Sequence, residues 1–104
     1  MAVRQFDVYE NPSSAGSRFA PYLVVLSSHL LADFDDAVVA PLVNDANGTV
    51  SELELDVSVQ DQELVLVISE LSTIASRNLR RRVGSLLDHE FEIRRALDRL
   101  FTGF

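Results

Sequence analysis

The sequence of 104 residues contains no cysteine and no lysine. Without cysteine, the chain can form neither a disulfide nor a thiolate metal site. Without lysine, every cation is a guanidinium, the group best suited to planar pairing with carboxylates. No apolar run approaches the ~20 residues of a membrane-spanning helix, and no basic start precedes a long apolar stretch. We therefore expect a cytoplasmic protein that has no contact with a membrane.

Positive charge is also missing from the middle of the chain. Residues 19–76 hold ten acidic residues and no basic one, whereas residues 77–104 hold seven arginines and four acids. A chain with a net charge of −7 does not offer the phosphate-neutralising surface that nucleic acids require, so we expect no direct nucleic-acid contact. The separation of charge favours a protein partner, because opposed patches orient association.

Short apolar runs with strand periodicity fill the first two thirds of the chain. We predict strands over residues 3–9, 22–26, 38–43, 53–59 and 64–68. In the first run, Phe6 and Val8 alternate with Asp7 and Tyr9, which is a period-2 strand signal. Over residues 53–59 the apolar residues alternate with Glu54, Asp56 and Ser58, which predicts one buried face and one exposed face. Five or six short strands at close spacing are typical of a small antiparallel barrel or sandwich.

Proline and turn residues punctuate these runs. Pro41 cannot donate to a ladder, so we place it at a sheet edge or at a bulge. The dipeptide Asn47-Gly48 predicts a turn before the strand over 53–59, and residues 60–62 predict another after it.

The last segment changes to a helical period. Its apolar stripe consists of Ile93, Ala96, Leu97, Leu100 and Phe101. Asp88 is the predicted N-cap, Glu90 and Arg94 form an i, i+4 pair, and Gly103 is placed to end the helix. We predict one domain over residues 1–104 that is mainly β and is closed by a C-terminal helix.

Three segments of the chain resemble the CcdB toxin family. They are Gln5-Phe6-Asp7-Val8-Tyr9, similar to a QFxVY start, Val38-Val39-Ala40-Pro41-Leu42, similar to a V-I-P-L strand, and the tail Leu100-Phe101-Thr102-Gly103-Phe104. The tail matches the family's ending of an aromatic residue, any residue, glycine and an apolar residue. Residues 68–104 can be laid on the family without a gap.

The resemblance implies an antiparallel, SH3-like barrel or sheet of the CcdB/MazF type that forms a homodimer without a cofactor. It implies the toxin of a type II toxin–antitoxin system, which binds the A subunit of DNA gyrase and traps the cleaved DNA complex. A CcdA-like antitoxin with a disordered tail would relieve this inhibition. The gyrase-binding positions of the family fall on Leu30, Leu31, Asp98, Thr102, Gly103 and Phe104.

Three positions depart from the family pattern: Thr102 replaces a tryptophan, Asp98 an asparagine and Ala32 an aspartate. Tryptophan is frequent among the residues that dominate interface energies, so its loss bears on gyrase binding. Two alternatives therefore stay open. One is a non-toxic homologue that keeps only the dimer and antitoxin binding, and the other is a MazF-like toxin that cleaves mRNA.

Catalytic and metal-binding residues are not expected. The two histidines, His29 and His89, have no partner at a recognised metal spacing. RNA cleavage needs acid–base groups, and basic residues are absent from residues 19–76, where the strand loops would have to supply them. We therefore expect an inhibitor of an enzyme and not an enzyme.

One dense charge cluster consists of Arg77, Arg80, Arg81 and Arg82. A charge run is usually a solvated face, and this one would balance the acidic middle of the chain. The alternative is a docking site for the acidic, disordered tail of the antitoxin, because such segments bind through extended charge-assisted contacts.

Overall fold

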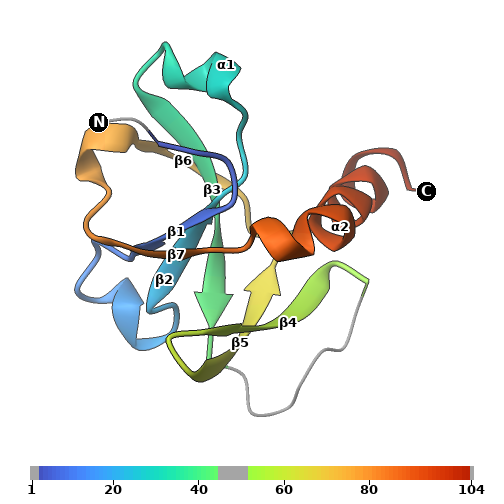
Figure 1. The fold of residues 1–104 in the computed structure, drawn as a ribbon, viewed down its shortest axis with the longest axis horizontal. Coiled ribbons are helices and arrows are strands. Elements are labelled where there is room, and N and C mark those ends of the chain that lie inside the picture. The colour runs from blue at the N-terminus through green and yellow to red at the C-terminus, as the bar shows by residue number, and fades with distance from the viewer. Residues whose placement is uncertain (1–2, 45–51, 104) are drawn as a thin grey trace.

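The computed structural model describes residues 3–44 and 52–103 (Figure 1). The strands are β1 (Asp7–Glu10), β2 (Tyr22–Val25), β3 (Asp36–Val43), β4 (Glu54–Val59), β5 (Gln62–Val67), β6 (Ser72–Ala75) and β7 (Arg82–Ser85). The α-helices are α1 (His29–Ala32) and α2 (Glu90–Thr102), and the 3-10 turns are η1 (Gly16–Arg18), η2 (Ser76–Asn78) and η3 (Leu87–His89). The four predicted strands after the first are confirmed with small shifts at their ends. The predicted Asn47-Gly48 turn lies outside the described residues.

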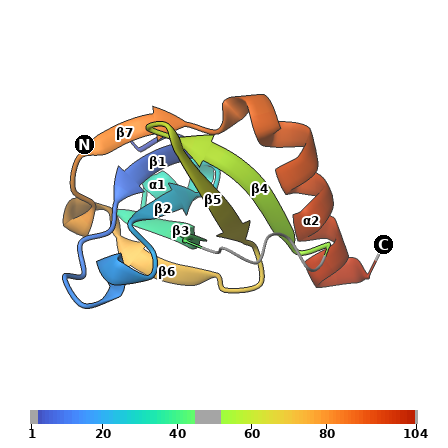
Figure 2. The ribbon, with the colours of Figure 1, turned by 90° about the horizontal axis from the view of Figure 1, so that it is seen from below.

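All strands pair antiparallel in one sheet, in the order β4-β5-β3-β2-β1-β7, with β6 also paired to β3. The sheet curls into a half-barrel, and α2 lies against it at the side of β4 (Figure 2). The mainly β, antiparallel fold with a C-terminal helix is therefore confirmed. The hairpin between β4 and β5 turns at Gln60 and Asp61, which both have positive φ, as a two-residue turn requires.

Pro41 lies in an interior strand and not at a sheet edge. On one side of β3, Leu42 pairs with Leu66 of β5 while Val39 pairs with Ser72 of β6, so the register shifts by three residues between them. Pro41 lies at this interruption, where no ladder partner needs its missing N–H. Of the two positions expected for Pro41, a sheet edge or a bulge, the structure shows a ladder irregularity inside the sheet.

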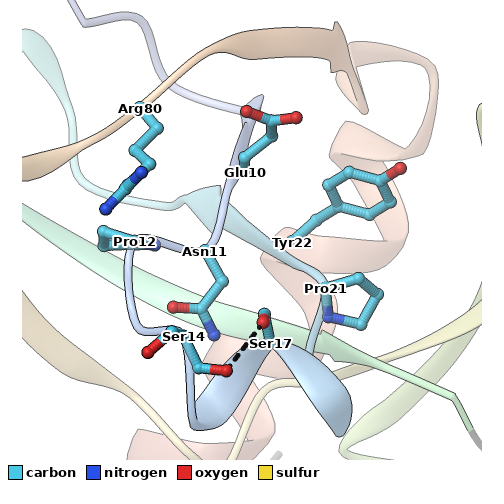
Figure 3. A pocket seen from close by; sticks show the side chains of 8 residues that line it. All are labelled: Glu10, Asn11, Pro12, Ser14, Ser17, Pro21, Tyr22 and Arg80. Carbon is cyan, nitrogen blue, oxygen red and sulfur yellow. Dashed lines mark hydrogen bonds between the residues drawn. The ribbon is translucent and has the colours of Figure 1, made fainter.

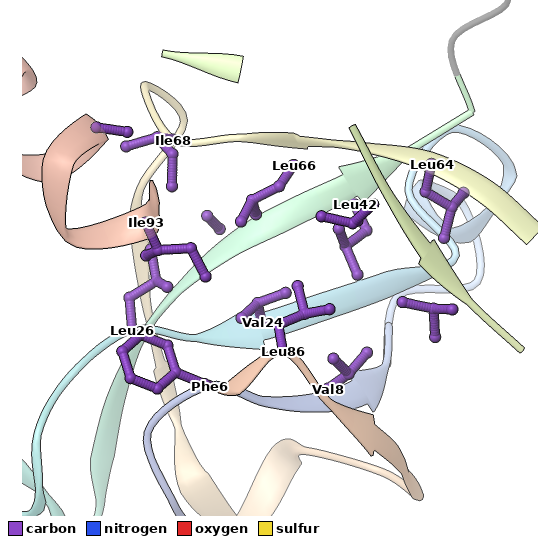
Figure 4. Packing of buried hydrophobic residues seen from close by; sticks show 14 residues of the cluster. Phe6, Val8, Val24, Leu26, Leu42, Leu64, Leu66, Ile68, Leu86 and Ile93 are labelled. Atoms are coloured by element: carbon purple, nitrogen blue, oxygen red, sulfur yellow. The ribbon is translucent and has the colours of Figure 1, made fainter. Parts of the chain in front are cut away.

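The main core fills the concave side of the sheet (Figure 4). Its largest fully buried side chains include Val8, Val24, Leu42, Leu66, Ile68 and Ile93. Ile93 and Ala96 bring α2 onto this core, and Leu97 and Leu100 pack against its rim. The apolar stripe of α2 is thus confirmed for four of its five residues. Phe101, the fifth, is 71% exposed and does not join this core.

A second apolar cluster covers the opposite face of β1, β2 and β3. It consists of Tyr9, Leu23, Val25, Ala37, Val39 and Leu79, with Val3 and Ile74 packed against it. The segment that follows η2 lies over this face and buries Leu79 in it. As a result, both faces of β1 are covered, and Asp7 and Tyr9 are buried although they alternate with the residues of the main core.

Strand β1 begins four residues later than predicted. Phe6 has a φ of 73°, a left-handed conformation that is rare for a bulky residue. Its N–H donates to the carbonyl of Val25 and its carbonyl accepts from the N–H of Leu86, at 2.6 and 2.8 Å. These bonds and the burial of the ring hold Phe6 in a conformation that does not fit a regular strand, so β1 begins only at Asp7.

Helix α2 ends as predicted but begins differently. Gly103 has a φ of 80° and its N–H donates to the carbonyl of Arg99, so it ends the helix. The pair between Glu90 and Arg94 is present at 2.8 Å. Asp88 is not the N-cap, because it lies within η3 and α2 starts only at Glu90. None of the helices described reaches the length and apolar character needed to cross a bilayer.

Candidate functional site

Helix α1 presents the first pair of predicted binding residues. The Ser28 hydroxyl accepts from the N–H of Leu30 and starts this short helix directly after β2. Leu30 is 69% exposed, whereas Leu31 is only half-buried. Phe34, in the acidic turn that follows, is also exposed. Helix α1 and the turn after it therefore expose two large apolar side chains, Leu30 and Phe34, and the family resemblance pointed only to Leu30.

The end of α2 presents the second group. The Thr102 hydroxyl donates to the carbonyl of Asp98 at 2.6 Å, and the side chains of both residues are exposed. Phe101 and Gly103 are exposed as well. The last turn thus projects beyond the residues that anchor the helix, as the sequence predicted for residues 102 and 103. The predicted apolar anchor Phe104 lies outside the described residues.

Within one chain, these two groups do not form a single patch. In Figures 1 and 2, α1 and the C-terminal end of α2 lie apart in both views. A partner that contacts both groups must therefore span the side of the molecule between them, or receive them from two copies of the chain.

The arginine segment, defined here as residues 76–82, is a charged surface that the fold holds in place. It crosses the outer face of the sheet, and the buried side chain of Leu79 anchors it there. The N–H of Leu79 donates to the carbonyl of Ser76, and the carbonyl of Arg81 accepts from the N–H of Glu10. Anchored in this way, the segment displays arginines on either side of Leu79.

The four arginines differ in what they contact. Arg82 Nε lies 3.1 Å from Oδ2 of Asp7, whose side chain is only 6% exposed. The hydrogen bond to Asp7 and the charge of its carboxylate raise the pKa of Arg82. Burial, and secondarily the charge of Asp7, raises the pKa of Tyr9 next to this pair. Arg82 is therefore a structural residue that compensates a buried carboxylate.

Arg81 forms a looser pair, with 3.5 Å between its Nη2 and Oε2 of Glu10, and the side chains are 74% and 41% exposed. Arg77 and Arg80 form no ion pair with any residue that the structure describes. The predicted cluster of four thus separates into one structural arginine, one that is loosely paired, and two that are available to a partner.

Two adjoining hollows surround the available arginines. The first, of roughly 360 Å³, is lined by Glu10, Asn11, Pro12, Ser14, Ser17, Pro21, Tyr22 and Arg80 (Figure 3). The second, of roughly 630 Å³, is lined by Pro12, Ser13, Ile74, Arg77, Asn78, Leu79 and Arg80. They share Pro12 and Arg80 and so form one groove. Sequence reasoning missed the contribution of the loop over residues 11–17, because only the fold brings it beside η2.

A smaller hollow of roughly 240 Å³ lies between α2 and β4. Phe91, which is 76% exposed, borders it together with Leu55 and Arg95. Arg99 closes one side through an ion pair with Glu52. In the described part of the chain, no three histidine or carboxylate side chains gather as a metal site would require.

Comparison with known proteins gives one family and a set of similar folds. The family model described as CcdB protein matches residues 5–103. No curated protein sequence matches the chain. Three similar solved structures are a mycobacterial endoribonuclease in complex with its cognate antitoxin, the Mycobacterium tuberculosis toxin MazF-mt6, and MazE-MazF from Deinococcus radiodurans.

The endoribonuclease is 15% identical, with a TM-score of 0.79 and coverage of 95% of this chain and 94% of that one. MazF-mt6 is 19% identical, with a TM-score of 0.69 and coverage of 94% and 96%. The Deinococcus structure is 16% identical, with a TM-score of 0.69 and coverage of 97% and 95%. At these identities, the likeness establishes a shared fold.

Proposed function

This chain belongs to the CcdB toxin family, and from that membership we propose that it is a toxin that inhibits DNA gyrase. It binds the A subunit and traps the cleaved DNA complex, and a cognate CcdA-like antitoxin neutralises it. The gyrase contact consists of Leu30, Leu31, Asp98 and the tail over residues 102–104. The protein acts as a homodimer in the cytoplasm.

The exposed end of α2 is the observation that supports gyrase binding best. Phe101, Thr102 and Gly103 extend past the buried part of the helix and contribute nothing to the main core. An exposed apolar side chain such as Phe101 or Leu30 is available to a protein partner without unfolding. The family match runs through both regions, since it covers residues 5–103.

The arginine segment is the proposed antitoxin site. A disordered acidic tail gains charge-assisted hydrogen bonds when it meets guanidinium groups that have no intramolecular partner. Among the residues that the structure describes, Arg77 and Arg80 meet that condition, whereas Arg82 is held by Asp7 and Arg81 is partly engaged by Glu10. We therefore assign most of the antitoxin contact to Arg77 and Arg80.

The groove chemistry supports a binding protein and not an enzyme. A general base must lie within hydrogen-bond reach of the proton that it removes. Glu10 is the one carboxylate that lines the groove, and it is paired with Arg81. Neither histidine lines the groove.

A pull-down of the purified A subunit of gyrase tests the proposal. The wild-type chain should retain the subunit, and Asp98→Ala should weaken retention. Thr102→Trp should strengthen it by about 5- to 150-fold, the equivalent of ~1–3 kcal/mol for restoring an aromatic anchor. The matched control is Glu92→Ala, an exposed change near the start of the same helix and away from the face that carries Asp98. No retention by the wild-type or by Thr102→Trp would contradict gyrase binding and favour the non-toxic homologue.

The fold likeness to endoribonucleases supports a second candidate, an mRNA-cleaving toxin. The same preparation incubated with single-stranded RNA should leave it intact. Specific cleavage that survives repurification and disappears in Arg80→Ala would identify the groove as a catalytic site and replace the gyrase proposal.

A further inference from the structure

Strand β6 has one edge without a partner. Among the residues that the structure describes, β6 pairs only with β3. The carbonyl of Val38 accepts from the N–H of Leu26, which follows β2. Because backbone groups alternate in direction along a strand, the even-numbered residues of β3 direct their N–H and C=O groups to β2, and the odd-numbered residues direct theirs to β6. Opposite those odd-numbered residues lie Ser72 and Ile74. The backbone groups of Thr73 therefore point away from the sheet.

The free edge of β6 leads directly into the groove of the arginine segment. Ile74 belongs to β6 and also lines the groove, and Arg77 follows the strand by two residues. Pro12 and Leu79 complete an apolar floor between Arg77 and Arg80. An added strand on β6 would thus lie beside an apolar floor that two cations flank.

The charges around this edge select an anionic occupant. Arg77 and Arg80 lack an ion-pair partner in the described structure, so an acidic ligand gains their full attraction. The chain as a whole carries a net charge of −7, which repels a long polyanion such as a nucleic acid. A short acidic peptide needs only the local cations and can also place an apolar side chain on the floor.

We propose that the free edge of β6 binds an extended acidic peptide by strand addition. The backbone of Thr73 exchanges hydrogen bonds with the peptide, Arg77 and Arg80 pair with its carboxylates, and one apolar side chain rests on Pro12, Ile74 and Leu79. Backbone pairing supplies affinity and the flanking cations supply specificity, as in other cases of strand addition. This inference rests on the proposed antitoxin contact and specifies how its acidic tail docks.

Fluorescence anisotropy with synthetic ten-residue peptides tests the docking mode in the full-length protein. The probe alternates glutamate with valine, and its comparison peptide replaces each glutamate with lysine. The acidic peptide should bind in the micromolar range and weaken as salt is raised, whereas the lysine peptide should not bind. No binding of the acidic peptide at millimolar protein, or equal binding of both peptides, would overturn the proposal.

Two proline variants test the strand edge itself. Thr73→Pro removes an outward N–H of β6 and should weaken the acidic peptide at least tenfold. Ser58→Pro is the control, because it removes an outward N–H from β4, which is the edge strand next to β5 in the strand order. The carbonyl of Leu53 accepts from the N–H of Ile68, which follows β5, so the odd-numbered residues of β4 bond to β5. The N–H of the even-numbered Ser58 therefore points away from β5. Unchanged binding in a folded Thr73→Pro protein would overturn strand addition.

Two double variants test whether Arg77 and Arg80 bind the peptide. This test holds even if the proline variants do not fold. Arg77→Gln with Arg80→Gln should weaken the acidic peptide at least tenfold. Arg18→Gln with Arg95→Gln changes the net charge equally at exposed arginines elsewhere and should leave binding within twofold. An equal loss in both would reduce the effect to net charge and overturn the site.

Binding of a ten-nucleotide oligothymidylate, compared with binding of the acidic peptide, tests whether the site prefers a peptide or a nucleic acid. Binding of the oligonucleotide as tight as that of the acidic peptide would overturn the proposal in favour of a nucleic-acid site. Failure of the gyrase pull-down would leave the peptide result intact. Conversely, failure of the peptide to bind would leave gyrase binding intact, so the two proposals fail independently.

Discussion

The two surfaces proposed for binding are attached to the core in different ways. In the arginine segment, residues that anchor the segment to the core alternate with residues proposed to bind a partner. For example, the buried Leu79 is followed directly by the exposed Arg80. In α2 the anchoring residues and the proposed binding residues are separated along the helix, because Ile93 is fully buried and Thr102 is exposed nine residues later. Loss of stability and loss of binding should therefore be easy to separate at the end of α2, and harder to separate in the arginine segment.

The largest expected effect lies at the buried start of α2. Ile93→Ala should lower the free energy of unfolding by about 2–5 kcal/mol, because it leaves a cavity at a residue that is 0% exposed. Phe101→Ala is the control on the same helix and should change it by less than about 0.5 kcal/mol, since the ring is already in water. Urea denaturation followed by circular dichroism measures both. Similar losses in the two variants would show that the helix is anchored along its whole length.

A smaller effect is expected where the arginine segment meets β1. Asp7→Asn should cost about 1–3 kcal/mol, because it removes the charged acceptor of a hydrogen bond at a residue that is 4% exposed. Glu10→Gln, on the neighbouring and more exposed pair, should stay within about 0.5 kcal/mol. The same urea measurement compares them. If both variants lost equal stability, the division of the arginines into structural and available ones would be wrong.

These two regions also show what the sequence could predict. Alternation identified β4 because one face is wet: Asp56 and Ser58 are exposed while Val57 and Val59 are buried. At β1, alternation does not separate a buried face from an exposed one, since Leu79 covers the face that carries Tyr9. A residue seventy positions away leaves no mark on local periodicity, so a second apolar cluster on the outer face could not be predicted.

The helix boundaries follow the same principle. Gly103 could be predicted because ending a helix in a left-handed conformation is a local requirement. The prediction of Asp88 as the N-cap was wrong because residues Leu87–His89 form a 3-10 turn ahead of the helix, so that Asp88 lies inside this turn. The resemblance to the family located the exposed tail, but the sequence could not distinguish Arg82 from Arg77, since the pairing of β1 with β7 is what brings Arg82 to Asp7.

The smallest effect on stability is expected for the tail, where the effect on function should be greatest. Deleting residues 102–104 removes the bond from the Thr102 hydroxyl to Asp98 and the Gly103 cap, and it places a carboxylate at the negative end of the helix dipole. Together these changes should cost less than about 1 kcal/mol, because the affected groups are exposed and the dipole effect is small. Urea denaturation of the truncated protein checks this cost.

The same truncated protein should fail to retain the A subunit of gyrase, because it lacks the surface that we assign to that contact. Ile93→Ala provides the matching reference, since it should lose stability through the core while leaving the tail residues in place. If truncation destabilised the protein as much as Ile93→Ala does, the tail would be structural and the gyrase assignment wrong. If the truncated and full-length proteins were equally stable and neither retained gyrase, the chain would keep the fold of the CcdB family without its toxic contact, and the groove beside β6 would remain its proposed binding surface.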